Sequence, residues 1–233
     1  MTRETAMGQK IAGVRGVPLE FWYDFASPYA YLAASRIEAL VSATGAAPPI
    51  HLAWRPFLLG PIFRRRAANP SPFQEAGPEE RRYRHRDIER LCHLYGLALK
   101  WPSTYPRGSL LAARVTLVAA EEGWGGAFTR AVFHANFVED RDIAAEGVVA
   151  AILRDLGRDA DPILARATAP EVKAKLAAQV EQAIAIGIFG APSFIAGDGE
   201  LFWGNDRLEQ AIAWAVAAGA GAPAESGNLR ARE

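Results

Sequence analysis

The sequence predicts an α/β fold in which two strand-containing segments flank a long helical insertion. A strand, a helix and a second strand follow one another between residues 19 and 54. From residue 57 to residue 192 strand patterns are missing, and apolar residues recur at helical spacing instead. A hairpin of two short strands then precedes a last helix. The element order is therefore strand–helix–strand, helices, strand–strand–helix.

The first unit is built on Leu19 to Phe25, an aromatic-rich run that is typical of a buried strand. A helix is expected from Pro28, because alanine, isoleucine and valine follow it at the spacing of one helical stripe. Ser27 stands at the N-cap of this helix, and Pro28 at its first position, where the missing N–H costs nothing. Ile50 to Trp54 predicts a second strand, parallel to the first.

The helical insertion is predicted from helix start and stop signals. Glycine follows the end of most of these segments, and proline or serine stands at several starts. The expected helices cover Pro78 to Tyr95, Ser109 to Glu122, Ala127 to Val138, Glu146 to Leu156 and Pro170 to Ile186.

Strand character returns at Ser193 to Ala196, and Gly197 to Gly199 predicts a hairpin turn into Leu201 to Trp203. Asn205 or Asp206 is then expected to cap a helix from residue 207 to about residue 218.

This order is that of a thioredoxin-like core with helices inserted between its halves. We expect the core to comprise residues 17–66 and 188–218, and the helical insertion residues 67–187. Residues 1–16 and 219–233 are small and polar, so a flexible N-terminal extension and a flexible tail are expected there.

Composition and charge exclude several classes of protein. The chain has 233 residues, of which 50% are hydrophobic and 22% charged, and its formal net charge is zero. This balance gives no reason to expect nucleic acid or a membrane surface as a partner. No apolar run approaches the roughly 18 residues of a membrane helix. The N-terminal residues do not resemble a signal peptide, so a cytoplasmic protein is expected.

Cysteine and histidine usage excludes other kinds of site. Cys92 is the only cysteine, so an internal disulfide and a cysteine-based zinc site are not possible. We interpret Cys92 as an inert core residue of a helix. The four histidines show no metal-ligand spacing, and no metal is expected; they are His51, His85, His93 and His134.

The turn after the first strand presents the active residues of a thioredoxin-like core. Redox members carry Cys-x-x-Cys in this window, whereas here it reads Ser27-Pro28-Tyr29-Ala30. Thiol–disulfide exchange by the protein itself is therefore not available. A hydroxyl at a helix N-terminus can instead hold the thiolate of another molecule, because the helix dipole and the hydrogen bond both favour the charged form. Simple helix capping is the structural alternative for Ser27.

Two further segments are candidates for ligand contacts. Gly190-Ala191-Pro192-Ser193 lies where thioredoxin-like folds keep a cis peptide bond, which would leave the Ala191 backbone free to pair with a bound peptide. In Trp203-Gly204-Asn205-Asp206 the glycine permits close backbone approach, and an acidic or amide side chain could hold a ligand ammonium group. A trans proline and a plain helix cap are the respective structural alternatives.

Arginines are frequent after residue 63. Arginine binds carboxylates through two parallel hydrogen bonds, and Arg64, just after an apolar turn, is the best candidate to bind a substrate carboxylate. The arginines between Arg81 and Arg86 stand among glutamates and aspartates, so we interpret them as the solvated face of a helix.

The segment Asp24-Phe25-x-Ser27-Pro28-Tyr29-x-Tyr31-Leu32 resembles the signature of the 2-hydroxychromene-2-carboxylate isomerases and of the related kappa-class glutathione transferases. The resemblance runs in order from about residue 19 to residue 215. Its further segments are Trp54-Arg55-Pro56-Phe57-x-Leu59-Gly60, Asn69 with Ser71-Pro72-Phe73, Tyr83 with Arg86-Asp87, Pro102 with Tyr105-Pro106, Asn136-Phe137 with Arg141-Asp142-Ile143, Gly190 to Phe194, and Phe202 to Leu208.

The resemblance implies a DsbA-like thioredoxin fold, a homodimer, and glutathione as the cofactor. The implied reaction interconverts 2-hydroxychromene-2-carboxylate, or a related aromatic carboxylate, and trans-o-hydroxybenzylidenepyruvate through reversible thiolate addition. It makes Ser27 the catalytic serine that holds the glutathione sulfur. The other implied contacts are cofactor-binding Ala191, Pro192, Trp203, Gly204, Asn205 and Asp206, and substrate-binding Arg64, Asn69 and Tyr105.

One position departs from this pattern. The family often has a lysine that meets the glycyl carboxylate of glutathione, and this chain has Glu80 there, followed by Arg81. Either Arg81 substitutes, or glutathione binds weakly. Two other functions remain open: a kappa-type glutathione transferase or peroxidase, which shares every glutathione contact, and a non-enzymatic thioredoxin-like module that binds glutathione or a peptide.

Overall fold

The computed structural model describes residues 16–65 and 76–220. The extension and the tail that we predict to be flexible lie almost wholly outside these ranges, as do Asn69 and the predicted boundary between residues 66 and 67. The described strands are β1 (Val17–Tyr23), β2 (Ile50–Pro56), β3 (Ser193–Ala196) and β4 (Leu201–Trp203). The described helices are α1 (Pro28–Ala43), α2 (Leu59–Arg65), α4 (Pro78–Tyr95), α5 (Leu110–Glu121), α6 (Gly125–Phe137), α7 (Glu146–Asp155), α8 (Ala160–Thr168), α9 (Pro170–Ile186), η1 (Asn205–Arg207) and α10 (Leu208–Gly219).

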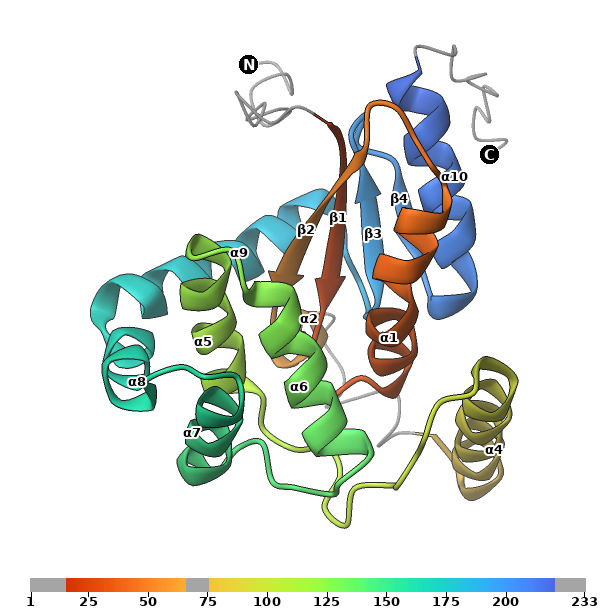
Figure 1. Cartoon of the computed structure of the whole chain (residues 1–233). Coiled ribbons are helices and arrows are strands. Elements are labelled where there is room, and N and C mark those ends of the chain that lie inside the picture. Colours follow the sequence, from red (N-terminus) through yellow and green to blue (C-terminus); the bar gives the residue numbers. More distant parts are fainter. Residues whose placement is uncertain (1–15, 66–75, 221–233) are drawn as a thin grey trace.

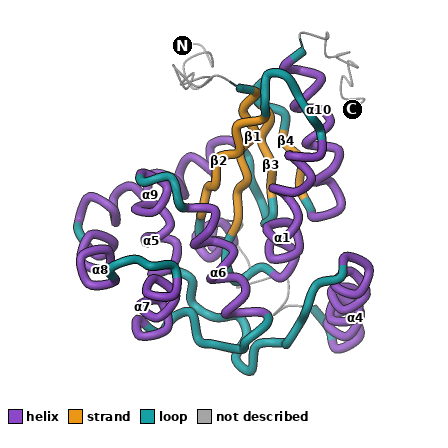
Figure 2. The backbone as a smooth tube through the Cα atoms, in the orientation of Figure 1, coloured by secondary structure: helices purple, strands orange, loops and turns teal. Residues whose placement is uncertain are grey.

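A sheet in the order β2-β1-β3-β4 forms the centre of the molecule, with helices around it (Figures 1 and 2). β1 and β2 run parallel, and β3 is antiparallel to both β1 and β4. The carboxyl end of β1 therefore meets the amino end of β3, where Trp22 pairs with Ser193. The turn that leads into α1 starts at this end of the sheet, which is the lower end in Figure 1.

The two faces of the sheet bury different sets of side chains, because successive residues of a strand point to opposite faces. Phe21 and Tyr23 of β1 and Phe194 of β3 are fully buried in the larger core, which also contains residues of α1, α6 and α10. Trp22, between them in β1, belongs to a second core with Ile195 and residues of α9. Each such aromatic side chain contributes about 1.5–3 kcal/mol through burial.

The inserted helices form two groups. α5 packs on α6, α8 and α9, and α7 packs on α8 and α6. α4 stands apart from them, beside the start of α1 (Figure 1). None of the helices in the described parts of the chain is long and apolar enough to cross a membrane.

The structure confirms the α/β fold class and most of the predicted elements. α4 and α9 have the predicted bounds, and each is followed by a glycine in the left-handed region, Gly96 and Gly187. The sequence did not predict α2 and α8: the segment before Arg64 was interpreted as an apolar turn, and no element was predicted for residues 160–168. Each helix has a proline in its first turn, Pro61 or Pro162, where the N–H groups have no partner within a helix, so the prolines do not prevent helix formation.

The predicted cap of the last helix is wrong. Neither Asn205 nor Asp206 makes a side-chain capping bond, because the chain forms the short helix η1 there before α10. The Asn205 amide is instead buried between Arg36 and Tyr95: its Oδ1 accepts from Arg36 at 3.4 Å, and its Nδ2 donates to the Tyr95 hydroxyl at 3.3 Å.

We predict that Gly187→Ala destabilises the protein, because Gly187 ends α9 with φ 93° and a side chain there costs about 1–2 kcal/mol. Gly147→Ala is the matched control: Gly147 lies in the first turn of α7, and an added Cβ would meet nothing within 4 Å at either position. The control should be neutral or stabilising by up to about 1 kcal/mol. Urea denaturation measures the free energy of unfolding of both variants. Equal effects of the two substitutions would contradict the claim that the left-handed backbone at Gly187 requires glycine.

Candidate functional site

Ser27 links the start of α1 to the segment before β3. Its Oγ accepts a hydrogen bond from the Ala30 N–H at 3.2 Å, which caps the helix as predicted. The same hydroxyl donates to the Ala191 carbonyl at 2.9 Å. A serine hydroxyl has one proton, so the bond to Ala191 uses it. Capping and contact with the segment before β3 therefore coexist in one side chain.

The segment before β3 has the predicted cis peptide bond between Ala191 and Pro192. The Pro192 carbonyl accepts from the N–H of Gly204 at 3.0 Å, which ties this segment to the end of β4. Gly204 has φ 114°, and a Cβ there would come within 2.3 Å of Asp206 Oδ1. Only glycine fits this connection without strain.

Trp203 borders the same segment as an exposed aromatic side chain. It is 51% exposed and lies at the end of β4, the edge strand of the sheet, where it pairs with Ser193. Its indole covers Gly190 so closely that a Cβ at Gly190 would lie 2.4 Å from Nε1, and the ring of Phe189 is centred 4.6 Å away. Aromatic side chains therefore lie against the backbone at Gly190, directly before Ala191.

Asp24 holds the turn between β1 and α1 in place. The carboxylate is 5% exposed and accepts three hydrogen bonds: from the Ala26 N–H at 3.0 Å, the Leu59 N–H at 2.8 Å and the Ser109 hydroxyl at 2.7 Å. These partners belong to the turn, to α2 and to the start of α5. Burial raises the pKa of Asp24, and the three donors oppose that rise.

A second buried bond fixes the same turn from α6. The amide of Asn136 donates to the Phe25 carbonyl at 3.0 Å, and its Oδ1 accepts from Arg107 at 3.2 Å. Arg107 is itself 6% exposed and forms an ion pair with Asp140. A hydrogen bond from the Ser103 N–H, followed by the contact with Arg107, lowers the pKa of Asp140 to about 2. The loops before α5 and after α6 are therefore joined beneath the turn.

The hydroxyls of Tyr29 and Tyr105 and the guanidinium of Arg84 interact electrostatically near the start of α1. The Tyr29 hydroxyl donates to Asp87 Oδ2 on α4 at 2.9 Å. Burial, together with the charges of Asp87 and Asp24 respectively, raises the pKa values of Tyr29 and Tyr105 above the usual range, while Arg84 acts on both in the opposite direction. Both tyrosines therefore keep their protons at neutral pH and are hydrogen-bond donors there.

The protein's own thiol is not at this site. Cys92 is buried on α4, as predicted, and burial and the nearby Glu89 raise its pKa to about 11. A thiol with that pKa is protonated at neutral pH and is a poor nucleophile.

Residues 12–212 match the family model described as the DSBA-like thioredoxin domain. The chain belongs to this family.

Relatives of this DSBA-like domain include proteins with named activities. A 2-hydroxychromene-2-carboxylate isomerase of Sphingobium xenophagum is 27% identical over 82% of this chain and 94% of its own length. Glutathione S-transferase kappa 2 of Caenorhabditis elegans is 27% identical over 82% of this chain and 88% of its own length. A solved 2-hydroxychromene-2-carboxylate isomerase structure superposes with a TM-score of 0.76 at 25% identity, covering 88% of this chain and 98% of the other.

The structure of this DSBA-like domain brings some of the predicted site residues together. Ser27, Ala191 and Pro192 meet at the end of β1, with Trp203 and Gly204 beside them. Tyr105 lies within electrostatic range of Asp24 and Tyr29.

Other predicted residues lie differently. Arg64 is an exposed residue in the last turn of α2, and no contact joins it to Ser27. The Asn205 side chain faces Arg36 and Tyr95, whereas Asp206 is exposed. Glu80 and Arg81 lie in the exposed first turn of α4. Asn69 is outside the described residues.

Sequence reasoning missed the supports of the site. Asp24 stood in the quoted signature, and a carboxylate at the end of a buried apolar run was the available signal. Ser109 was expected only as a helix start, and neither Asn136 nor Arg107 had a predicted role. Their partners lie 29 to 111 positions away in the sequence, and no local pattern reveals such pairs.

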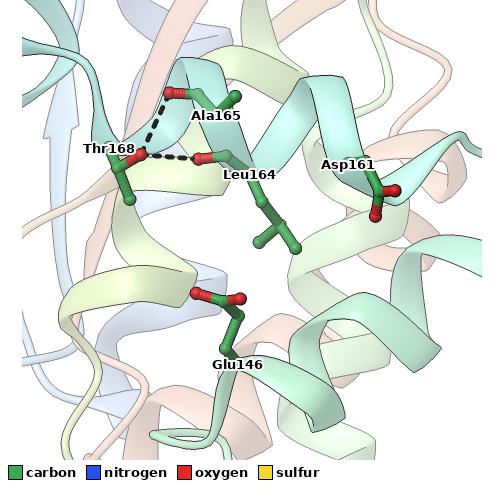
Figure 3. Close-up of a pocket in the computed structure, with 5 residues that line it drawn as sticks. All are labelled: Glu146, Asp161, Leu164, Ala165 and Thr168. Carbon is green, nitrogen blue, oxygen red and sulfur yellow. Dashed lines mark hydrogen bonds between the residues drawn. The ribbon is translucent and has the colours of Figure 1, made fainter.

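The described surface also has an open hollow of about 330 Å³ between α7 and α8 (Figure 3). It is lined by Glu146, Asp161, Leu164, Ala165 and Thr168. The Thr168 hydroxyl bonds the carbonyls of its own helix, so the hollow offers little directed chemistry. Within residues 16–65 and 76–220 no three His, Cys, Asp or Glu side chains gather as metal ligands would.

We predict that Asp24→Asn destabilises the protein by about 1–3 kcal/mol, because the amide NH₂ would face groups that donate to the carboxylate. The raised pKa means that the folded state binds the Asp24 proton more tightly than the unfolded state. Protonation therefore stabilises the wild type as pH falls, and the deficit of Asp24→Asn should grow as the pH falls from neutrality toward about 4, the ordinary pKa of an aspartate. Denaturant titrations at several pH values measure it.

Asp155→Asn is the control for that experiment, because Asp155 is an exposed carboxylate at the end of α7. It should change stability by less than about 0.5 kcal/mol at every pH. If the stability deficit of Asp24→Asn shrinks as the pH falls, the pKa of Asp24 is not raised in the folded protein.

Proposed function

We propose that this protein is a glutathione-dependent isomerase that interconverts 2-hydroxychromene-2-carboxylate, or a related aromatic carboxylate, and the ring-opened trans-o-hydroxybenzylidenepyruvate. The observation that carries the proposal is Ser27, a hydroxyl at the N-terminus of α1 within 2.9 Å of the Ala191 carbonyl. This is the position where a redox protein of this fold needs a thiol. The isomerase relatives at 27% identity support the choice of reaction.

The residues present fit a thiol-containing peptide. The hydroxyl proton that now bonds the Ala191 carbonyl can turn to a ligand sulfur, and that carbonyl can then accept from a ligand amide, as the backbone at a sheet edge does. Trp203, beside this segment, is exposed, and Ala191 is half-buried. The single cysteine of the chain, Cys92, is buried elsewhere, so a reactive thiol has to come from a ligand.

When bound, glutathione would supply a nucleophilic thiolate that adds to a conjugated carbon of the substrate and leaves again. Ser27 then has the role of hydrogen-bond donor to the sulfur, and the positive end of the α1 dipole favours the same charge. Together these effects lower the thiol pKa by about one to two units, at about 1.4 kcal/mol per unit. Tyr105, protonated at neutral pH, is proposed to donate to a substrate oxygen, and Arg64 and Asn69 remain proposed substrate contacts.

A kappa-type glutathione transferase or peroxidase is the second candidate, favoured by the 27% identity to glutathione S-transferase kappa 2. It would use the same Ser27 site with a different electrophile. A conjugation assay with a model electrophile distinguishes it from the isomerase. A binding module without catalysis is the third, and the assay below excludes it if turnover is seen. A homodimer is part of the proposal and is measured by light scattering.

We predict that Ser27→Ala lowers the isomerisation rate at saturating glutathione by about 10- to 100-fold, because a hydrogen bond to a charged group contributes about 1.5–3 kcal/mol. A spectrophotometric assay with and without glutathione measures the rate. Ser35→Ala is the matched control: Ser35 lies on the same helix, and its hydroxyl bonds the Tyr31 carbonyl. The control should retain activity within about twofold.

Two results of that assay would contradict the proposal. A Ser27→Ala protein with the wild-type rate would remove the assigned role of the hydroxyl. A wild-type rate that does not depend on glutathione would remove the cofactor.

A further inference from the structure

We propose that Arg84 on α4 binds a carboxylate group of a ligand held at Ser27. This inference rests on the proposed function and identifies the cation that the site needs. The ligand carboxylate has two possible sources, glutathione itself and the aromatic acid, and the chemistry of recognition by a guanidinium is the same for both.

The contact between α4 and α1 places Arg84 near the site. The Tyr29 hydroxyl donates to Asp87 at 2.9 Å, and Tyr29 is two residues beyond Ser27. Asp87 therefore marks the side of α4 that faces the start of α1. Arg84 precedes Asp87 by three positions, which puts both side chains on the same side of the helix.

Electrostatics agree with this placement. Arg84 acts on the hydroxyls of both Tyr29 and Tyr105, favouring their charged forms, and Tyr105 in turn interacts with Asp24 at the base of the turn. The guanidinium thus lies within electrostatic range of tyrosines from two segments that are distant in the sequence. The sequence predicted that Arg84 belongs to a solvated helix face. Its side chain is only 25% exposed, so this prediction is wrong for Arg84.

One of the partners of Arg84 can be displaced by a ligand carboxylate. Arg84 forms an i,i+4 ion pair with Glu80, whose side chain is 54% exposed. The carboxylate end of this pair is exposed, so water screens it, and Glu80 regains its hydration on leaving. The Asp87 carboxylate accepts from the Tyr29 hydroxyl and lies 3.4 Å from Arg90. With these partners it does not compete with a ligand carboxylate for the Arg84 guanidinium. A ligand carboxylate can therefore replace Glu80 at the guanidinium.

Arg86 is the matched control within the same helix. It lies two positions from Arg84, so it points to a different side of α4. It also forms an ion pair with a glutamate of the helix, Glu89, and its side chain is 63% exposed. Arg84→Gln and Arg86→Gln therefore remove the same charge and the same kind of pair, and only one of them faces the site.

Calorimetric titration tests the inference without requiring turnover. The wild type, Arg84→Gln, Arg86→Gln and Glu80→Gln are each titrated with glutathione and, separately, with chromone-2-carboxylate as an unreactive aromatic acid. Arg84→Gln should weaken binding of one of these anions tenfold or more, and the anion affected identifies the source of the carboxylate. Arg86→Gln should stay within twofold. Glu80→Gln should bind that anion as tightly as the wild type or more tightly, because the competing carboxylate is gone.

The outcomes separate this inference from the proposed function. If Arg84→Gln alone loses affinity but the wild type does not isomerise the chromene, the inference stands and the proposed function fails. If Glu80→Gln weakens binding as much as Arg84→Gln, the ion pair is only structural and the inference is wrong. If Arg84→Gln binds both anions like the wild type, or if the wild type binds neither, the inference is also wrong.

Discussion

The buried carboxylate of Asp24 is the constraint on which the site depends. It takes hydrogen bonds from the turn after β1, from the start of α2 and from the start of α5, and so joins the core to its inserted helices. A buried carboxylate with fewer donors would be costly. Once these three groups are fixed, the direction in which α1 leaves β1 is fixed as well, and with it the position of Ser27.

Ser27 then serves two purposes. Its oxygen caps α1, and its proton reaches the segment before β3. A thiol at this place would exchange with disulfides, whereas a hydroxyl does not, and we propose that it holds the charge of a thiolate that another molecule brings. The chain's single cysteine, Cys92, is buried on α4 with a raised pKa. This agrees with the proposal that the reactive thiol comes from the ligand.

The sequence was sufficient for the fold because local signals agreed with each other. Pro28, Gly96 and Gly187 marked helix boundaries correctly, and the aromatic run of β1 marked the central strand. It missed the short helices α2 and α8, and it failed where a polar residue turns inward instead of capping a helix, as Asn205 does. Arg84 was taken for a solvent-facing residue because its neighbours are charged, and only the contact between Tyr29 and Asp87 shows which side of α4 faces the site.

The central claim, that Ser27 and the N-terminus of α1 stabilise a borrowed thiolate, is tested most directly by the thiol pKa of bound glutathione. The ultraviolet absorbance of the thiolate, followed against pH in the complex, measures it. The account predicts a value about one to two units below the roughly 8.5 of a free thiol in the wild type, and a return toward the free value in Ser27→Ala. An unshifted pKa in the wild type, or the same shift in both proteins, would contradict it.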